Sequence, residues 1–161
     1  MNIVIFGPPG AGKGTQADNL VKNYNLIKIS TGDLLREEIK KKTELGIEIN
    51  SIMKQGSFVK DNIIDNLIEN TISNPLNQNR MIFDGYPRNL NQAKKLDLLL
   101  NNYNQKIFSV ISLNVDKNIV VKRILGRIIC SKCGITFNKF FNPPSESKHN
   151  CESKHLVVRS D

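Results

Sequence analysis

The chain has 161 residues, 39% of them hydrophobic and 24% charged, and a formal net charge of +8 at pH 7. This length and composition predict one compact globular domain with small inserts. The first apolar run is too short for a signal peptide and no later stretch could span a bilayer, which argues against a secreted or membrane protein and favours a cytoplasmic one.

The positive charge has two sources of different meaning. Lysine runs such as KKK at 40–42 are typical of solvated helix faces. A net positive charge also fits anionic partners, either nucleic acid or small phosphorylated ligands.

Strands and helices alternate along the first 125 residues. The apolar run at 2–6 predicts a buried parallel strand, and a glycine loop and an amphipathic helix at 15–24 follow it. Further helices are expected from Ser30–Asp33 onward, at 44–54, behind Asp61 as N-cap, at 91–103 and behind Asp116, with strands at 80–83 and 107–115. This order predicts a parallel α/β sheet with right-handed crossovers. From Gly126 onward helical periodicity disappears, and we expect a separate small lobe.

The stretch GPPGAGKGT at 7–15 nearly fits the phosphate-binding pattern G-x-x-x-x-G-K-[ST]. The position after Lys13 usually carries a hydroxyl that ligates magnesium, but here it is Gly14 and the hydroxyl comes at Thr15. Backbone N–H groups of such a loop converge on an anion, and the following helix adds its positive dipole end. The stretch therefore predicts a binding site for the phosphates of a nucleoside triphosphate.

Asp84 follows the predicted strand at 80–83, where the carboxylate that orders a metal-bound water belongs. Transfer of a phosphoryl group between two phosphates needs no nucleophilic side chain, but it needs alignment and cancellation of charge. Arginine suits that task because its forked donors stay protonated. Candidates near loop or helix edges are Arg36, Arg88, Arg123, Arg127 and Arg159.

Five motifs in this order resemble the adenylate kinases of the nucleoside monophosphate kinase group: GPPGAGKGTQA at 7–17, STGDLLR at 30–36, FDGYPRNLNQA at 83–93, VKRILGR at 121–127 and FNPP at 141–144. The resemblance implies the reaction Mg-ATP + AMP ⇌ 2 ADP, and glycine after the loop lysine is a feature of this group. It implies a P-loop NTPase sheet flanked by helices as the core (1–29 and 60–125), an inserted helical AMP-binding lobe (30–59) and a small β-rich ATP lid (126–161).

The resemblance also implies roles for individual residues. The ATP site would comprise Gly10, Ala11, Gly12, Lys13, Gly14, Thr15, Arg123 and Arg127. The AMP site would comprise Thr31, Gly32, Arg36, Met53, Ser57, Phe58, Val59, Gly85, Tyr86, Arg88 and Gln92. The catalytic set would be Lys13, Asp84, Arg88, Arg123, Arg127 and Arg159. Arg36 and Arg88 would grip the AMP phosphate, and Gln92 would read the adenine edge.

Three positions depart from the commoner family pattern. Ser57 stands where lysine is frequent and Phe58 where leucine is frequent. Asn89 stands where threonine is usual, and asparagine there resembles the pyrimidine monophosphate kinases, although those relatives have a short lid.

Cys130-x2-Cys133 followed by Cys151 favours metal binding over disulfides and resembles the zinc lid of many bacterial adenylate kinases. The family places its fourth ligand three residues after the third, which here is Lys154. We expect His155 as the substitute, and His149 is the weaker candidate because its spacing to Cys151 is short. Such a zinc ion would be structural.

We expect ATP, AMP and ADP as partners, magnesium with ATP, a monomer, and no nucleic-acid or membrane partner. The alternatives are a kinase that uses UMP, CMP or GTP and, more remotely, a zinc-ribbon module that binds nucleic acid. The family continues beyond the sequence that ends here at Asp161, so we expect a fragment with little activity alone.

Overall fold

The computed structural model describes residues 1–55, 57, 59–145 and 149–158. The chain forms two compact units, which are taken in turn. The first comprises Met1–Phe6 and Lys13–Ser112, and the second comprises Gly7–Gly12 and Leu113–Asp161. Among the helices that the structure describes, none is both long and apolar enough to cross a membrane.

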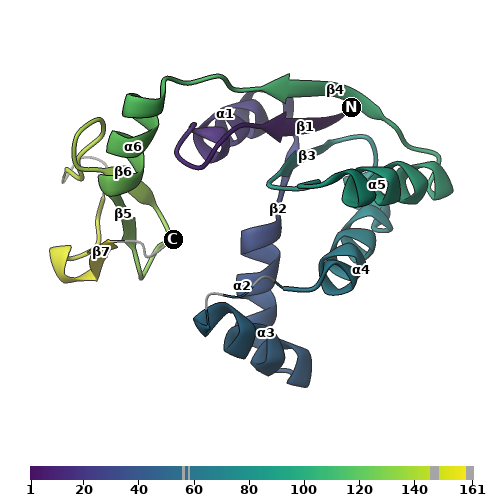
Figure 1. The fold of residues 1–161 in the computed structure, drawn as a ribbon, viewed down its shortest axis with the longest axis horizontal. Coiled ribbons are helices and arrows are strands. Elements are labelled where there is room, and N and C mark those ends of the chain that lie inside the picture. Colours follow the sequence, from purple (N-terminus) through teal and green to yellow (C-terminus); the bar gives the residue numbers. More distant parts are fainter. Residues whose placement is uncertain (56, 58, 146–148, 159–161) are drawn as a thin grey trace. The chain divides into compact units, whose positions relative to one another are not determined.

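A parallel sheet of four strands forms the centre of the first unit (Figure 1). The strand order is β2 (Ile27–Ser30), β3 (Met81–Asp84), β1 (Asn2–Phe6) and β4 (Ile107–Ser112), and each neighbouring pair is parallel. Parallel pairing places the carboxyl ends of β2 and β3 together, since Ser30 is in register with Asp84. This edge of the sheet is where α/β proteins bind ligands.

Helices bury the apolar side chains of this sheet. Helix α1 (Lys13–Tyr24) packs on β1, β2 and β3, with Ala17 fully buried. Helices α4 (Asp61–Ile72) and α5 (Leu90–Asn102) pack on each other and share one hydrophobic core with Val4 and Phe83. The α/β class with a parallel sheet flanked by helices is therefore confirmed.

Two helices are inserted between β2 and α4. Helix α2 (Thr31–Lys41) begins at Ser30, whose hydroxyl accepts a hydrogen bond from the Asp33 N–H. Helix α3 (Glu44–Lys54) begins at Thr43, whose hydroxyl accepts from the Gly46 N–H. These two caps satisfy N–H groups that a helix leaves unpaired at its start.

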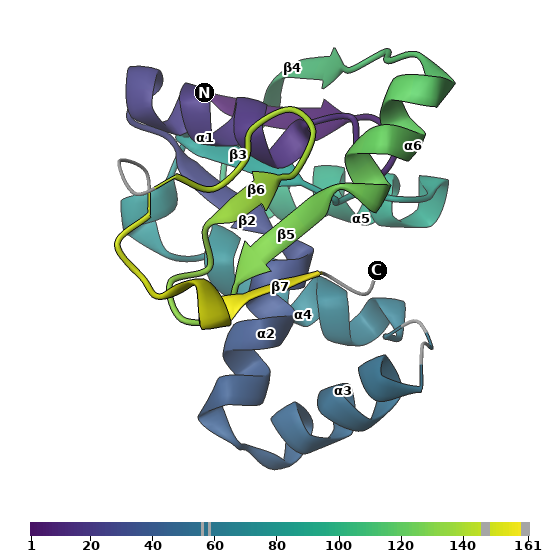
Figure 2. The same ribbon diagram turned by 90° about the vertical axis from the view of Figure 1, so that its left-hand side faces the viewer.

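The second unit consists of the loop Gly7–Gly12, helix α6 (Lys117–Leu125) and a small antiparallel sheet. Asp116 caps α6 through hydrogen bonds from two backbone N–H groups, as the sequence predicts. The sheet order is β6 (Thr136–Asn138), β5 (Arg127–Cys130) and β7 (Leu156–Val158), and Figure 2 shows these strands side by side. Two 3-10 turns, η1 (Pro75–Asn77) in the first unit and η2 (Ser153–His155) in this one, complete the elements that the structure describes.

Two details differ from the expectation. Asp61 is not the N-cap of α4: the cap is Lys60, which makes no side-chain hydrogen bond there, and Asp61 is the first helical residue. The Asp61 carboxylate is used instead by two amides of another helix, described below. The strand expected at 107–115 ends earlier, at Ser112.

Candidate nucleotide site and metal group

The loop Gly7–Gly12 is held by the arginine of α6. Nη1 of Arg123 donates hydrogen bonds to the carbonyl oxygens of Ala11 (2.9 Å) and Gly10 (3.4 Å). Because the carbonyl and the next N–H of a trans peptide point in opposite directions, this contact turns the following N–H groups away from Arg123. The Ala11 N–H donates to the Pro8 carbonyl (3.1 Å), whereas the Gly12 N–H is directed away from Arg123, as the binding of an anion by this loop requires.

Gly10 is required where it stands in this loop. Its φ of 80° lies in the left-handed region, and a Cβ there would come within 3.0 Å of the Ile124 side chain. A side chain at this position would therefore strain the backbone and collide with α6.

In the first unit, α1 begins at Lys13 and its first turn lies against Asp84 of β3. A Cβ on Gly14 would be 3.6 Å from Oδ2 of Asp84, so the position that usually carries a metal-binding hydroxyl faces a carboxylate directly. Burial raises the pKa of Asp84, and the positive charges of Lys13 and Lys28 oppose that rise. Desolvation and nearby lysines are the setting of a carboxylate that can hold a cation or a metal-bound water.

A hydrogen-bonded group joins the carboxyl ends of β2 and β3. Arg88 donates from Nε to the Gly85 carbonyl (2.8 Å) and from Nη2 to Oγ1 of Thr31 (3.2 Å). Thr31 in turn donates to the same Gly85 carbonyl (3.2 Å). Two contacts fix the plane of the Arg88 guanidinium, and its remaining N–H groups suit a phosphate.

Arg36, on α2, forms an ion pair with Asp33, three residues earlier on the same helix, with 2.5 Å between Nη2 and Oδ1. Both side chains are exposed. Burial would raise the pKa of Asp33, but the hydrogen bond and charge of Arg36 outweigh it and hold that pKa below its usual value. The Arg36 guanidinium lies 3.2 Å from the place of a Cβ on Gly32, so glycine there gives it room. An exposed pair of this kind contributes little to stability, which leaves Arg36 able to exchange Asp33 for another anion.

The Gln92 side chain is buried and its amide is bonded at both ends. Oε1 accepts from the backbone N–H of Arg88 (2.7 Å), and Nε2 donates to Oδ1 of Asp61 (2.7 Å). The Gln92 backbone N–H donates to Oδ1 of Asn89, which caps α5. Asn89 thus does locally what a threonine could do in the same place, since both residues cap helices well.

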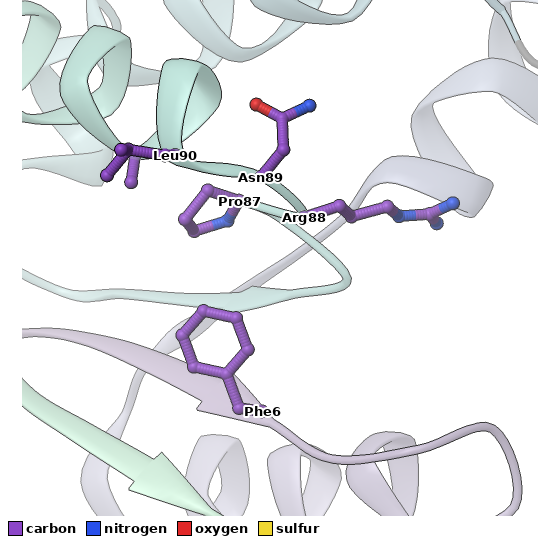
Figure 3. A pocket seen from close by; sticks show the side chains of 6 residues that line it. Phe6, Pro87, Arg88, Asn89 and Leu90 are labelled. Carbon is purple, nitrogen blue, oxygen red and sulfur yellow. The ribbon is translucent and has the colours of Figure 1, made fainter.

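An apolar pocket of about 290 Å³ lies beside the same loop. Figure 3 shows the ring of Phe6 facing Pro87, whereas the polar ends of Arg88 and Asn89 point away from Phe6. The pocket is lined by Phe6, Pro87, Arg88, Asn89, Leu90 and Ala93. Its walls are mainly apolar, so the polar groups of this loop serve a different surface.

The second unit brings its three cysteines together with one histidine. One possible ligand atom each from Cys130, Cys133, Cys151 and His149 lie within 4.8 Å of one another. Burial raises the pKa of Cys130, but hydrogen bonds from the Cys133 N–H and from His149 outweigh it and lower that pKa to about 6. Three sulfurs and one nitrogen at this spacing are a donor set that zinc prefers.

The structure groups His149 with the three cysteines, although the spacing in the sequence favours His155. His155 ends the turn η2, and its carbonyl accepts hydrogen bonds from the N–H and hydroxyl of Ser131. His149 is buried, with its ring packed edge-on against Phe137 at 5.2 Å between centroids. Its Nε2 is buried without a hydrogen-bond partner among the described residues.

Comparison with known proteins places the chain in a family. The adenylate kinase family model matches residues 5–159. The chain belongs to the adenylate kinase family. It is 49% identical over its full length to an adenylate kinase of Pelagibacter ubique, of which it covers 76%. Adenylate kinases of Mycoplasma capricolum (42% identity, all of this chain, 75% of the relative) and Enterococcus faecalis (41%, 89% of this chain, 67% of the relative) are also similar.

The remaining residues expected in an adenylate kinase site are spread along the same elements. Tyr86 is buried with its hydroxyl on Asp65, Val59 is buried, and Met53 is exposed near the end of α3. Ser57 donates its N–H to the Ile52 carbonyl. Arg127 is the first residue of β5. Thr15 lies in the first turn of α1. Phe58 and Arg159 lie outside the described residues.

Two polar partners in these groups were not expected from the sequence. The sequence pattern predicts a helix cap at Asp61, whereas its carboxylate accepts from Gln92, 31 residues away. Asn89 departs from the family pattern, and its place directly before a helix is the signal that indicates its role as a cap.

Proposed function

We propose that this chain transfers the terminal phosphoryl group of Mg-ATP to AMP reversibly, giving two ADP, and so serves adenine nucleotide homeostasis. Family membership supports the reaction. The structural observation that carries the assignment of residues is the Arg88 guanidinium, fixed against Thr31 and Gly85 at the sheet edge. A planar, permanently charged donor held in one orientation suits a phosphate monoester.

AMP would bind to the first unit through its phosphate and its base. Arg88 would hold the phosphate, and Arg36 would join it by releasing the exposed carboxylate of Asp33. Gln92 would contact the adenine through the second hydrogen of Nε2 and the second lone pair of Oε1. Residues 30–59 would form the lobe that closes over AMP, with Gly32, Met53, Ser57, Phe58, Val59 and Tyr86 as its remaining contacts.

The phosphates of ATP would bind to the backbone amides of residues 10–15, with Lys13 reaching the transferred group. Arg123 would act from the helix that already holds the loop carbonyls, and Arg127 would add a second charge. Residues 126–161 would form the lid, and Arg159 keeps its expected role at the end of that lid. The acceptor phosphate oxygen is already ionised, so these groups align and neutralise charge, and no general base is needed.

Magnesium, bound together with ATP, would neutralise charge on the phosphates. Asp84 fits that ion because its carboxylate faces the first turn of α1 at Gly14 and has lysines nearby. Glycine at position 14 leaves Asp84 as the nearby oxygen donor in place of a loop hydroxyl.

Zinc would be held by Cys130, Cys133, Cys151 and His149 as a structural ion. The fit rests on the spacing of the four donors and on the buried Nε2 of His149, which otherwise lacks a partner in the described part of the chain. A three-stranded sheet of short strands has little core of its own, and a tetrahedral ion would fix its shape. The ion would do no chemistry.

We also propose a cytoplasmic monomer whose partners are ATP, AMP and ADP, without a nucleic-acid or membrane partner. Three free cysteines grouped with a histidine support a reducing compartment over an oxidising one.

A phosphoryl-transfer assay across donors and acceptors tests this proposal. With Mg-ATP as donor we expect AMP to exceed UMP, CMP and GMP as acceptor, and GTP to be the poorer donor. Arg88→Lys should lower kcat/KM for AMP about a hundredfold, because lysine cannot replace two fixed guanidinium bonds. Arg80→Lys, at the other end of β3, is the matched control. Preference for a pyrimidine acceptor would support the related kinases, and salt-sensitive DNA binding without any transfer would support the zinc-ribbon alternative.

A further inference from the structure

The Asp61 carboxylate accepts hydrogen bonds from the side-chain amides of Asn89 and Gln92. Oδ1 accepts from Nε2 of Gln92 at 2.7 Å, and Oδ2 accepts from Nδ2 of Asn89 at 3.2 Å. Asp61 is the first residue of α4, and Gln92 lies in the first turn of α5. The contact therefore links two helices of the same unit at their N-terminal ends.

This contact fixes the orientation of the Gln92 amide. At the other end of the amide, Oε1 accepts from the Arg88 backbone N–H at 2.7 Å. A backbone N–H can only donate and an ionised carboxylate can only accept, so the partners determine which end is oxygen and which is nitrogen. A flipped amide would set oxygen against carboxylate and N–H against N–H, in a side chain that is only 3% exposed.

A fixed amide presents one defined pattern to a ligand. After these two bonds, Gln92 retains one hydrogen on Nε2 and one lone pair on Oε1. A 6-aminopurine offers a donor at its amino group and an acceptor at N1, which matches that pattern. A 6-oxopurine offers an acceptor at O6 and a donor at N1, which matches only the flipped amide.

We propose that Asp61 is a specificity-determining residue, which acts by positioning Gln92 so that the site accepts 6-aminopurine monophosphates and rejects 6-oxopurine monophosphates. The inference rests on the proposed function, in which Gln92 contacts the base of AMP. Asp61 would touch no reacting atom and would act only through the Gln92 amide.

Two further contacts hold Asp61 in place for this role. The amide of Asn89 binds its second oxygen, so the carboxylate cannot rotate away without losing that bond. Helix α4 is tied to the same loop one turn later, where Asp65 accepts from the Tyr86 hydroxyl at 2.7 Å. The positive end of the α4 dipole also favours a negative charge at this first helical position.

Asp61→Asn is the sharpest test, since asparagine has the same shape but can donate as well as accept. The probes are AMP and IMP, measured by titration calorimetry and as acceptors of phosphate from Mg-ATP. We expect AMP to bind about tenfold more weakly and the preference for AMP over IMP to fall at least about tenfold, with KM for Mg-ATP unchanged. Asp61→Glu, which still only accepts, should retain most of the preference.

Asp65→Asn is the matched control on the next turn of α4: its Oδ1 can still accept the Tyr86 hydrogen bond, so it should keep the wild-type preference. In the wild-type protein, the two Nε2 protons of Gln92 should exchange slowly with water and have chemical shifts displaced from those of an exposed glutamine. This measurement needs no variant to fold. Chemical shifts and exchange rates equal to those of an exposed glutamine would overturn the proposal.

The results for these variants distinguish a wrong role for Asp61 from a wrong function for the protein. An unchanged AMP preference in folded Asp61→Asn, or an equal loss in Asp65→Asn, overturns the role of Asp61 while adenylate transfer stands. If wild-type protein fails to bind AMP, or if Gln92→Leu binds it as well as wild type, the proposed function itself is wrong.

Discussion

The hydroxyl of Tyr86 donates a 2.7 Å hydrogen bond to Oδ1 of Asp65, from a side chain that is only 1% exposed. Burial, together with the hydrogen bond and charge of Asp65, raises the pKa of Tyr86, so the hydroxyl keeps its proton and remains a donor. Tyr86 lies between Gly85 and Arg88 in the loop after β3, and Asp65 lies on α4. The bond therefore anchors the loop on which the phosphate-binding arginine depends.

Tyr86→Phe should lower the free energy of unfolding by about 1 kcal/mol, because Asp65 loses a neutral donor but remains partly accessible to water. Urea denaturation measures the loss. A double-mutant cycle with Asp65→Ala should show coupling of similar size. If the two losses simply add, the hydrogen bond contributes nothing to stability.

Asp84→Asn should separate stability from activity. Burial raises the pKa of Asp84, so the folded state holds the proton to higher pH than the unfolded chain does. The stabilising contribution of this carboxyl is therefore complete below its ordinary pKa of 3.8 and is lost as pH rises through the raised value. We expect the variant to be at least as stable as wild type at pH 7, with a difference that shrinks toward pH 4.

The activity of Asp84→Asn should fall, although its stability should not. Loss of the negative charge that serves the magnesium site should lower kcat about a hundredfold or more, while AMP binding by calorimetry stays near wild type. Thermal unfolding of both proteins across the pH range checks the first expectation. A variant clearly less stable than wild type at pH 7 would contradict the burial argument.

Local patterns predicted most of the elements in the first 125 residues. The apolar stripes and cap residues placed α1, α3, α5 and α6 close to their observed bounds, because the signal for each lies within a few consecutive residues. The strand β2 was not expected. Its four residues include Lys28 and run directly into the helix start at Ser30, so only pairing with β3 identifies it as a strand.

The residues of the candidate site also differ in whether the sequence predicts their roles. The phosphate loop, Asp84 and Arg88 are recognisable from short motifs, since their chemistry depends on neighbours in sequence. The role of Asp61 depends on amides 28 and 31 residues away, and no local signal distinguishes it from a helix cap. The same limit applies to His155, where spacing favoured one histidine and the folded loop brings another to the cysteines.

Gly46→Ala tests the close packing of α2 against α3. A Cβ at Gly46 would overlap the backbone carbonyl of Glu38, which cannot move without disturbing α2. We expect a loss of about 2 kcal/mol in unfolding free energy, after allowing for the better helix propensity of alanine. Ser51→Ala, at an exposed position of the same helix, should change stability little. Equal stability of the two variants would mean that the helices are not packed this closely.

Zinc content distinguishes the two histidines directly. Protein purified with zinc and then dialysed should hold about one ion per chain in wild type and in His155→Ala. His149→Ala should weaken zinc binding by about a hundredfold or more, because a metal ligand is lost together with its packing on Phe137. Mass spectrometry of the metal and the absorption of a cobalt-loaded sample measure this without reference to catalysis.

The thermal stability of the same proteins completes this test. A chelator should lower the unfolding temperature of wild type and of His155→Ala, since zinc bound only to the folded lobe stabilises it by mass action. The same chelator should leave His149→Ala unchanged, because that variant starts without the ion. If His155→Ala loses zinc and His149→Ala keeps it, the histidine that completes the group in the structure is not the ligand. The buried Nε2 of His149 would then have no partner, within the part of the chain that the structure describes, that explains its burial.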